Sequence, residues 1–185
     1  YWQAGTGYGH GSVSSGRSWD PEAHKAAEQQ KDKELGEVFR TIAAELRAHT
    51  PKEISFEHLN TSCLVPVLEL YLHNDSIFDQ VQRITLYEQI VNVLEALAAQ
   101  DKWVPIFLER SNASKNLFEL FKAINKQASV LLTSSKKFDS NTNHATESDK
   151  DVCIAFAHKL TDLFKRVESR IATSKALTAP QPPSC

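Results

Sequence analysis

The chain has 185 residues, of which 41% are hydrophobic and 24% are charged, and its formal net charge is -2. This composition is typical of one globular domain with a buried core. Lysine and arginine are spread along the chain without the basic stripe of a nucleic-acid binder, and no apolar run approaches the ~20 residues that span a bilayer. We therefore expect neither nucleic-acid binding nor membrane insertion.

The cysteine content favours a reducing compartment. Cys63, Cys153 and Cys185 are far apart, odd in number and without metal-ligand spacing, which is typical of an intracellular protein. The chain also contains no methionine and starts at Tyr1. We therefore expect a cytoplasmic location, and we expect the chain to be a piece of a longer protein.

Residues 1–19 form a predicted glycine-rich N-terminal segment. They hold five of the six glycines and little aliphatic content, which indicates a loop. Four aromatic residues (Tyr1, Trp2, Tyr8 and Trp19) are unusual in a simple connector. Aromatic side chains beside glycine commonly pack on a neighbouring surface, so Tyr8 and Trp19 are candidate docking residues.

A long helix is predicted to follow Asp20. Asp20 is a capping acceptor, and Pro21 fits the first helical position. The helix is polar on all sides through Lys33, so we expect its first half to project into solvent. Pro51 is predicted to lie beyond its end. The predicted apolar stripe consists of Leu35, Val38, Phe39, Ile42 and Leu46.

Two further helices are predicted in the middle of the chain. In the first, Ser62 is a possible N-cap, and Pro66 is tolerated only in the first turn. In the second, from Thr85 to Gln100, Thr85 and Glu88 match a capping box. The predicted buried positions are Leu64, Val67, Leu68, Tyr71 and Leu72 in the first helix, and Leu86, Ile90, Val93, Leu94 and Leu97 in the second.

The C-terminal part is predicted to contain a short helix around Pro105, two longer helices, a polar loop at 134–148 and a proline-rich tail at 176–185. Ser148 and Asp151 match a second capping box. The predicted buried positions are Leu117, Leu120, Phe121, Ile124, Ala128 and Leu131, and in the last helix Val152, Phe156, Leu160, Leu163, Val167 and Ile171.

These patterns predict an all-α protein without strands. The dipeptides Val65-Pro66 and Val104-Pro105 repeat at an offset of 39 residues. A period near 40 with paired helices is typical of armadillo and HEAT repeats. We therefore predict an armadillo/HEAT-like stack of helices over residues 20–175, and an irregular helix bundle is the alternative.

No pattern for catalysis, metal binding or cofactor binding is complete. The glycine segment lacks the lysine of a phosphate-binding loop and the spacing of a dinucleotide-binding loop. The seven histidines show no metal-ligand spacing. His58 and Cys63 lie close in sequence, but a cysteine in an apolar helix start is more often buried and inert. We therefore expect that this chain is not an enzyme and binds no cofactor or metal.

Four blocks of the sequence together resemble one protein family. They are "GTGYGHGSVSSGRSWD", "SCLVPVLELYLHNDSIFD", "LYEQIVNVLEALAA" and "VPIFLE". They resemble a helical region of the giant BIR-containing ubiquitin-conjugating proteins of the BRUCE/Apollon family, which lies just ahead of the UBC domain. UBC domains carry an H-P-N motif before their catalytic cysteine, whereas Leu72 to Asp75 here form "LHND". The resemblance therefore transfers no catalytic residue.

The resemblance implies a non-catalytic scaffold domain of an inhibitor-of-apoptosis protein. Such a domain would position the UBC domain of the same parent chain, hold a homo-oligomer together or present apoptotic proteins as substrates. If it binds peptides as armadillo domains do, the outward positions Glu88, Asn92 and Glu95 are the candidate surface, although the usual groove asparagine aligns near Ala96. The alternative for these three residues is plain solvation. The alternative functions are a helical adaptor unrelated to ubiquitin and a nucleotide-binding enzyme that uses the glycine segment.

Overall fold

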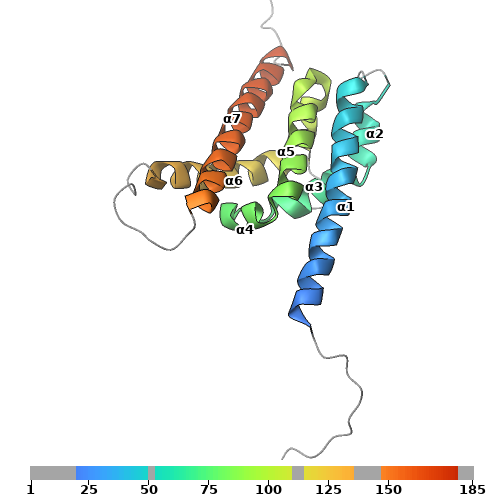
Figure 1. The fold of residues 1–185 in the computed structure, drawn as a ribbon. Helices are drawn as coiled ribbons and strands as arrows, with labels where there is room; N and C mark the ends of the chain where they lie inside the picture. The colour runs from blue at the N-terminus through green and yellow to red at the C-terminus, as the bar shows by residue number, and fades with distance from the viewer. Residues whose placement is uncertain (1–19, 50–52, 110–114, 136–146, 179–185) are drawn as a thin grey trace, which may run out of the picture.

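A computed structural model describes residues 20–49, 53–109, 115–135 and 147–178 (Figure 1). The helices are α1 (Pro21–Ala48), α2 (Phe56–Thr61), α3 (Leu64–Leu72), α4 (Ile77–Gln82), α5 (Ile84–Ala99), the 3₁₀ helix η1 (Asp101–Phe107), α6 (Leu117–Ser135) and α7 (Glu147–Thr178). These residues contain no strand, so the prediction of an all-α protein is confirmed for them.

Three long helices, α1, α5 and α7, lie side by side and run in the same direction (Figure 1). Gly36 of α1 lies beside Gln89 near the start of α5, and further along Arg47 reaches the backbone of Asn92. On the other side of α5, Arg166 of α7 bonds to Glu95. The three helices therefore form a parallel layer with α5 in the middle.

The inner side of this layer rests on the other helices. α6 runs across α7, and the ring of Phe118 stacks on Phe164 at 5.4 Å between centroids. The indole N–H of Trp103 in η1 donates to the carbonyl oxygen of Ile54 at 3.3 Å. One continuous apolar core extends from α1 to α7. Its largest fully buried side chains include Trp103, Phe39, Phe107, Phe121 and Leu46.

The predicted start of α1 is confirmed, because the side chain of Asp20 accepts hydrogen bonds from the backbone N–H groups of Glu22 and Ala23. The capping box of Thr85 and Glu88 is wrong. Helix α5 starts at Ile84, directly after the end of α4, so Arg83 is its N-cap and no loop precedes Thr85. Arg83 is at once the C-cap of α4 and the N-cap of α5, which leaves no room for a separate capping residue.

Two other predicted starts also differ. Cys63, not Ser62, is the N-cap of α3, because Ser62 closes the short helix α2, which was not predicted from the sequence. The hydroxyl of Ser62 still accepts a hydrogen bond from the N–H of Leu64 at 3.2 Å. Helix α7 begins at Glu147, so Ser148 lies within its first turn, and the capping box of Ser148 and Asp151 is wrong.

Most predicted apolar stripes are confirmed, and the stripe of α5 is buried in full. Val38 and Val152 are exceptions, with exposed fractions of 52% and 39%. In α1 the buried face rotates to Gly36, Phe39, Ala43 and Leu46, a spacing of three and four residues that leaves position 38 outside. Val152 lies near the start of α7, which begins at Glu147.

The polar first half of α1 projects beyond the rest of the molecule, as predicted (Figure 1). Every residue from 21 to 31 is exposed. Asp32 is the exception to the predicted solvation through Lys33, because it pairs with Arg83. Among the described residues no helix is long and apolar enough to cross a membrane.

The predicted loop at 134–148 is shorter in the structure, since α6 continues to Ser135 and α7 begins at Glu147. Helix α7 also continues through Thr178, so the predicted tail starts inside it. Residues 1–19, 136–146 and 179–185 lie outside the described residues, and this includes the candidate docking residues Tyr8 and Trp19.

Candidate functional site

The outward face of α5 carries the predicted surface residues. The spacing is four residues from Glu88 to Asn92 and three residues from Asn92 to Glu95, which places all three on one side of a helix. Glu88 is exposed, and Asn92 and Glu95 are half-buried because α1 and α7 flank them. The structure therefore brings the three predicted residues together on the outer face of the layer.

Glu95 is held by both neighbouring helices. Its Oε1 atom accepts a hydrogen bond from Nη1 of Arg166 at 2.7 Å, and its Oε2 atom lies 3.7 Å from Nη2 of Arg47. Arg47 also donates to the backbone carbonyl oxygen of Asn92 at 3.2 Å. This carboxylate therefore links α1 to α7 across α5, which is a role that solvation alone does not describe.

A third arginine lies at the C-terminal end of α5. Nη1 of Arg170 donates to the carbonyl oxygen of Ala99 at 3.3 Å and to the carboxylate of Asp101 at 2.8 Å. The last carbonyl groups of a helix have no partner within the helix and carry partial negative charge, so a cation is favoured there. Arg47, Arg166 and Arg170 thus form one polar cluster with Glu95 and Asp101.

Asn92 faces the surface, and Ala96 does not. The amide Nδ2 of Asn92 donates to Oε1 of Gln89 at 3.1 Å. Ala96, where the groove asparagine of an armadillo domain was aligned, is buried with an exposed fraction of 1%. Asn92 is therefore the asparagine on the outer face of α5.

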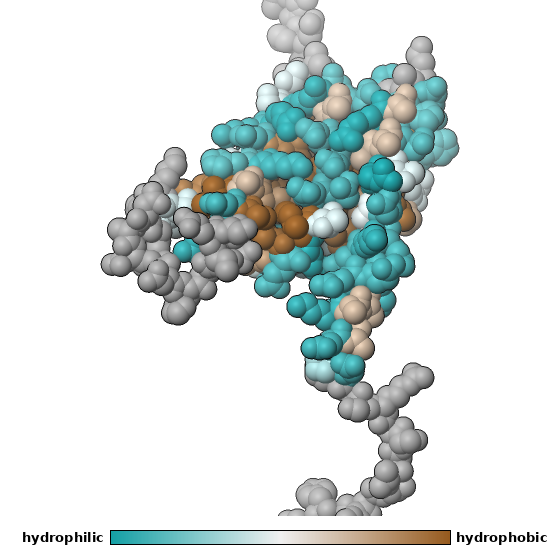
Figure 2. Space-filling model, in the orientation of Figure 1, coloured by the Kyte–Doolittle hydropathy of each residue, from teal (hydrophilic) through white to brown (hydrophobic). Residues whose placement is uncertain are grey.

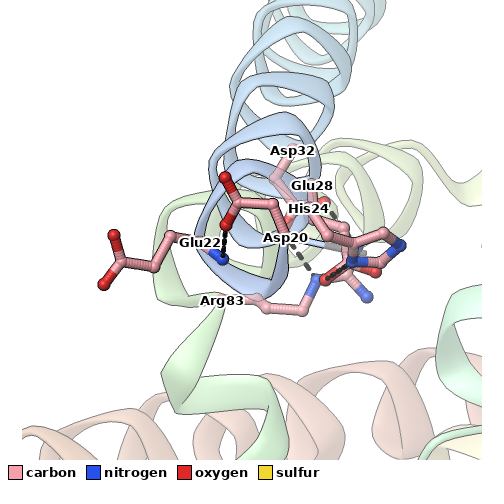
Figure 3. A network of polar contacts seen from close by, with 6 residues as sticks. All are labelled: Asp20, Glu22, His24, Glu28, Asp32 and Arg83. Atoms are coloured by element: carbon pink, nitrogen blue, oxygen red, sulfur yellow. Dashed lines mark hydrogen bonds and ion pairs between the residues drawn. The ribbon is translucent and has the colours of Figure 1, made fainter. Parts of the chain in front are cut away.

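A second polar cluster anchors the projecting half of α1 (Figure 3). The guanidinium of Arg83 forms two hydrogen bonds with the carboxylate of Asp32, one of them from Nε to Oδ2 at 2.6 Å. The same guanidinium lies over the ring of Tyr71 at 5.6 Å from its centroid. The hydrogen bond with Asp32 raises the pKa of Arg83, which keeps it charged. His24 and Glu28 pair at 3.8 Å further out on α1.

The residues considered for nucleophilic chemistry are separated. Cys63 is exposed at the start of α3, and Cys153 is buried in α7. Nδ1 of His58 pairs with the hydroxyl of Ser55 at 3.0 Å, and the hydrogen bonds of the described residues include none between His58 and Cys63. The described part of the chain holds no group of three or more His, Cys, Asp or Glu residues that could bind a metal.

The arginines of this cluster were not predicted from the sequence. Arg47 lies 45 residues from its partner Asn92, and Arg166 lies 71 residues from Glu95. Helical periodicity relates residues only within a helix, so it could not find these pairs. The one local signal was the position of Arg47 in the last turn of α1, where basic residues favour the helix dipole.

No protein-family profile matches the chain. The curated relatives include the dual E2 ubiquitin-conjugating enzyme/E3 ubiquitin-protein ligase BIRC6 of Mus musculus, which is 29% identical over 60% of this chain and 3% of its own length. The Homo sapiens protein of the same name is 28% identical with the same coverage. The probable ubiquitin-conjugating enzyme E2 R521 of Acanthamoeba polyphaga mimivirus is 25% identical over 96% of this chain and 12% of its own length.

These matches relate the chain to proteins of ubiquitin conjugation. They also contradict the expectation that the chain is not an enzyme, because relatives named as ubiquitin-conjugating enzymes match 60 to 96% of it. That prediction is wrong. The chain spans only 3 to 12% of the length of these curated relatives.

Proposed function

We propose that this chain is a helical binding and positioning segment of a ubiquitin-conjugating enzyme. In this proposal the outer face of α1, α5 and α7 holds a protein segment near the site of ubiquitin transfer. That segment belongs to a substrate, to a second copy or to the UBC domain of the same parent chain. Apoptotic proteins as substrates and a cytoplasmic location remain predictions from the family resemblance.

The parallel layer is the observation that carries this proposal. Its inner side is covered by the core, and its outer side presents the polar stripe of α5 between the arginines of two neighbouring helices. Helices that are fixed on one side by a core form a rigid surface. Binding of a partner therefore costs little free energy for ordering this surface. The comparisons support the ubiquitin part of the proposal at the level of relatedness.

We further propose that the layer corresponds to one side of an armadillo/HEAT-like stack. Two observations support this. Three parallel helices occupy one layer, and the other helices lie behind them (Figure 1). In addition, Val65 and Val104 of the repeated Val-Pro dipeptides are both buried. Pro66 is exposed in the first turn of α3, whereas Pro105 lies inside the 3₁₀ helix η1.

A ubiquitin-transfer assay on the parent enzyme tests the function. We expect the double variant Glu88→Arg/Asn92→Ala to reduce transfer to substrates about tenfold, since one misplaced charge at a contact costs roughly 1.4 kcal/mol or more. Formation of the ubiquitin thioester should remain unchanged. Both residues point away from the core, so the fold should tolerate the changes.

Glu168→Arg is the matched control. Glu168 is an exposed acid on α7, two residues beyond Arg166, so it lies on a different side of that helix. We expect this variant to transfer ubiquitin like the unchanged enzyme. The proposal fails if the double variant transfers ubiquitin to every substrate at the unchanged rate, or if the control is impaired equally.

A further inference from the structure

The outer face of the layer has an apolar end. Phe78 of α4 is exposed at 62%, which is unusual for a side chain of its size. Figure 2 shows apolar side chains gathered where α4, α6 and the start of α7 meet, beside the polar surface that covers the upper part of the layer. Ile84, the first residue of α5, is half-buried and packs against the core.

Val152 extends this apolar end along α7. Val152, Lys159 and Arg166 are spaced by seven residues, so they lie nearly in line along one flank of the helix. Arg166 reaches Glu95, and therefore this flank faces α5. Val152 precedes Arg166 by about 21 Å along the helix axis, and in a parallel layer this places it level with the junction of α4 and α5.

The opposite end of the same surface is cationic. Arg47, Arg166 and Arg170 gather there, while Glu95 and Asp101 are the carboxylates that bind them. The positive charges thus exceed the negative charges by one. Arg47 lies 3.7 Å from Glu95 and donates to the carbonyl oxygen of Asn92, and its side chain is 48% exposed. Its remaining N–H donors can bind a further carboxylate.

From these two ends we infer that the outer face of α5 binds an extended peptide that carries an acidic residue about five positions from an apolar residue. The apolar side chain packs on Phe78 and Val152, and the acidic side chain binds Arg47 beside Arg166. Ile84 and Glu95 are about 16 Å apart along α5, and an extended chain rises about 3.3 Å per residue, which gives the spacing. This inference rests on the proposed function and specifies the chemistry of the bound segment.

Glu88 adds a restriction to this chemistry. It is exposed and lies between the apolar end and the arginines. An acidic side chain in the middle of the peptide would face this carboxylate, and like charges in contact are unfavourable. The middle positions of the peptide should therefore be neutral or basic, and the acid should occur only near the end that reaches Arg47.

Selection from a library of random peptides tests the inference. Peptides of about ten residues are long enough to span α5 when extended. The displayed peptides are selected for binding to the 185-residue chain. The enriched sequences are then resynthesised with a fluorescent label, and their affinity for the chain is measured by fluorescence anisotropy. We expect an acidic residue about five positions from an aliphatic or aromatic residue in the enriched set.

Paired variants assign the two ends. Phe78→Ser should weaken binding about tenfold. Leu70→Ser should not, because Leu70 is exposed at 70% on α3, which lies behind the layer (Figure 1). Arg47→Gln should remove the preference for an acidic residue. Arg40→Gln is its control, since Arg40 is exposed on the same helix and pairs with Glu37. Circular dichroism verifies that each variant remains folded.

Three results would overturn the inference: no enriched peptides, enriched peptides without the acid, or equal losses for each variant and its control. Self-association of the chain that Phe78→Ser abolishes would also overturn it, because the occupant would then be a second copy. The transfer assay on the parent enzyme is independent of these results. A loss of transfer without the peptide preference would therefore reject this inference and retain the proposed function.

Discussion

The hydroxyl group of Tyr87 donates a hydrogen bond to the backbone carbonyl oxygen of Tyr71 at 3.2 Å. Burial raises the pKa of Tyr87 above its usual value of about 10, because the phenolate loses solvation. The nearby guanidinium of Arg83 opposes this rise without cancelling it. The neutral form of Tyr87 is therefore the one that the fold requires.

This pKa shift predicts a loss of stability at alkaline pH. Above the pKa of the unfolded chain, near pH ~10, unfolded Tyr87 releases a proton that the folded chain retains. The free energy of unfolding then falls as pH rises, by up to ~1.4 kcal/mol per pH unit from this group alone. Urea denaturation at several pH values measures the slope. Tyr87→Phe should show a shallower fall, and equal slopes for the two proteins would contradict the prediction.

At the scale of the helices, Gly36 is a position where the sequence is not optimal for stability. It lies buried in the middle of α1, with no positive φ among the described residues. A Cβ atom added there would lie 3.9 Å from Cγ of Gln89 and 3.9 Å from the carbonyl oxygen of Thr85, which is ordinary van der Waals contact. The space between α1 and α5 therefore accepts one methyl group.

We expect Gly36→Ala to raise the free energy of unfolding by about 0.5–1 kcal/mol, because glycine inside a helix costs that much relative to alanine. Urea denaturation monitored by circular dichroism measures the change. Gly36→Leu is the informative counterpart, since its larger side chain should force the two helices apart and destabilise the protein by about 1–3 kcal/mol. A decrease in stability for Gly36→Ala would show that the helices pack more closely than described.

Helix periodicity predicted the elements better than their ends and outer faces. The stripe of α5 was correct because the inner side of that helix faces the continuous core, so periodicity and burial coincide. Val38 was misplaced because the apolar pattern gives the direction of the buried face only approximately, and α1 buries Gly36, Phe39, Ala43 and Leu46 instead. The capping box at Thr85 failed because Arg83 joins two helices without a loop.

Only part of the candidate site could be predicted from the sequence, and the rest became visible in the three-dimensional structure. Glu88, Asn92 and Glu95 could be read from one helix, since residues spaced by four and three share a side. The arginines that bind Glu95 come from helices distant in sequence, and a match of charge between α1, α5 and α7 depends on their parallel packing. Phe78 was not selected because nothing in a short helix distinguishes an exposed phenylalanine from a buried one.

For the whole molecule, the continuity of the core predicts cooperative unfolding. The apolar cluster extends without a break from α1 to α7, and α5 contributes to it from the middle of the layer. Leu94 of α5 is fully buried, with an exposed fraction of 0%. Helices that share one core lose their packing together, so the transitions of the helical segments that pack on this core should coincide.

Leu94→Ala should lower the free energy of unfolding by about 2–5 kcal/mol, because it removes buried methyl groups and leaves a cavity. Trp103 is fully buried and reports on η1, provided that Trp2 and Trp19 are replaced by phenylalanine. In each of the two proteins, with and without Leu94→Ala, its fluorescence and the circular dichroism should report one common urea midpoint. Leu70→Ala, at an exposed position, should change stability by no more than about 0.5 kcal/mol. Separate midpoints for the two signals would mean that α5 and its neighbours form more than one cooperative unit.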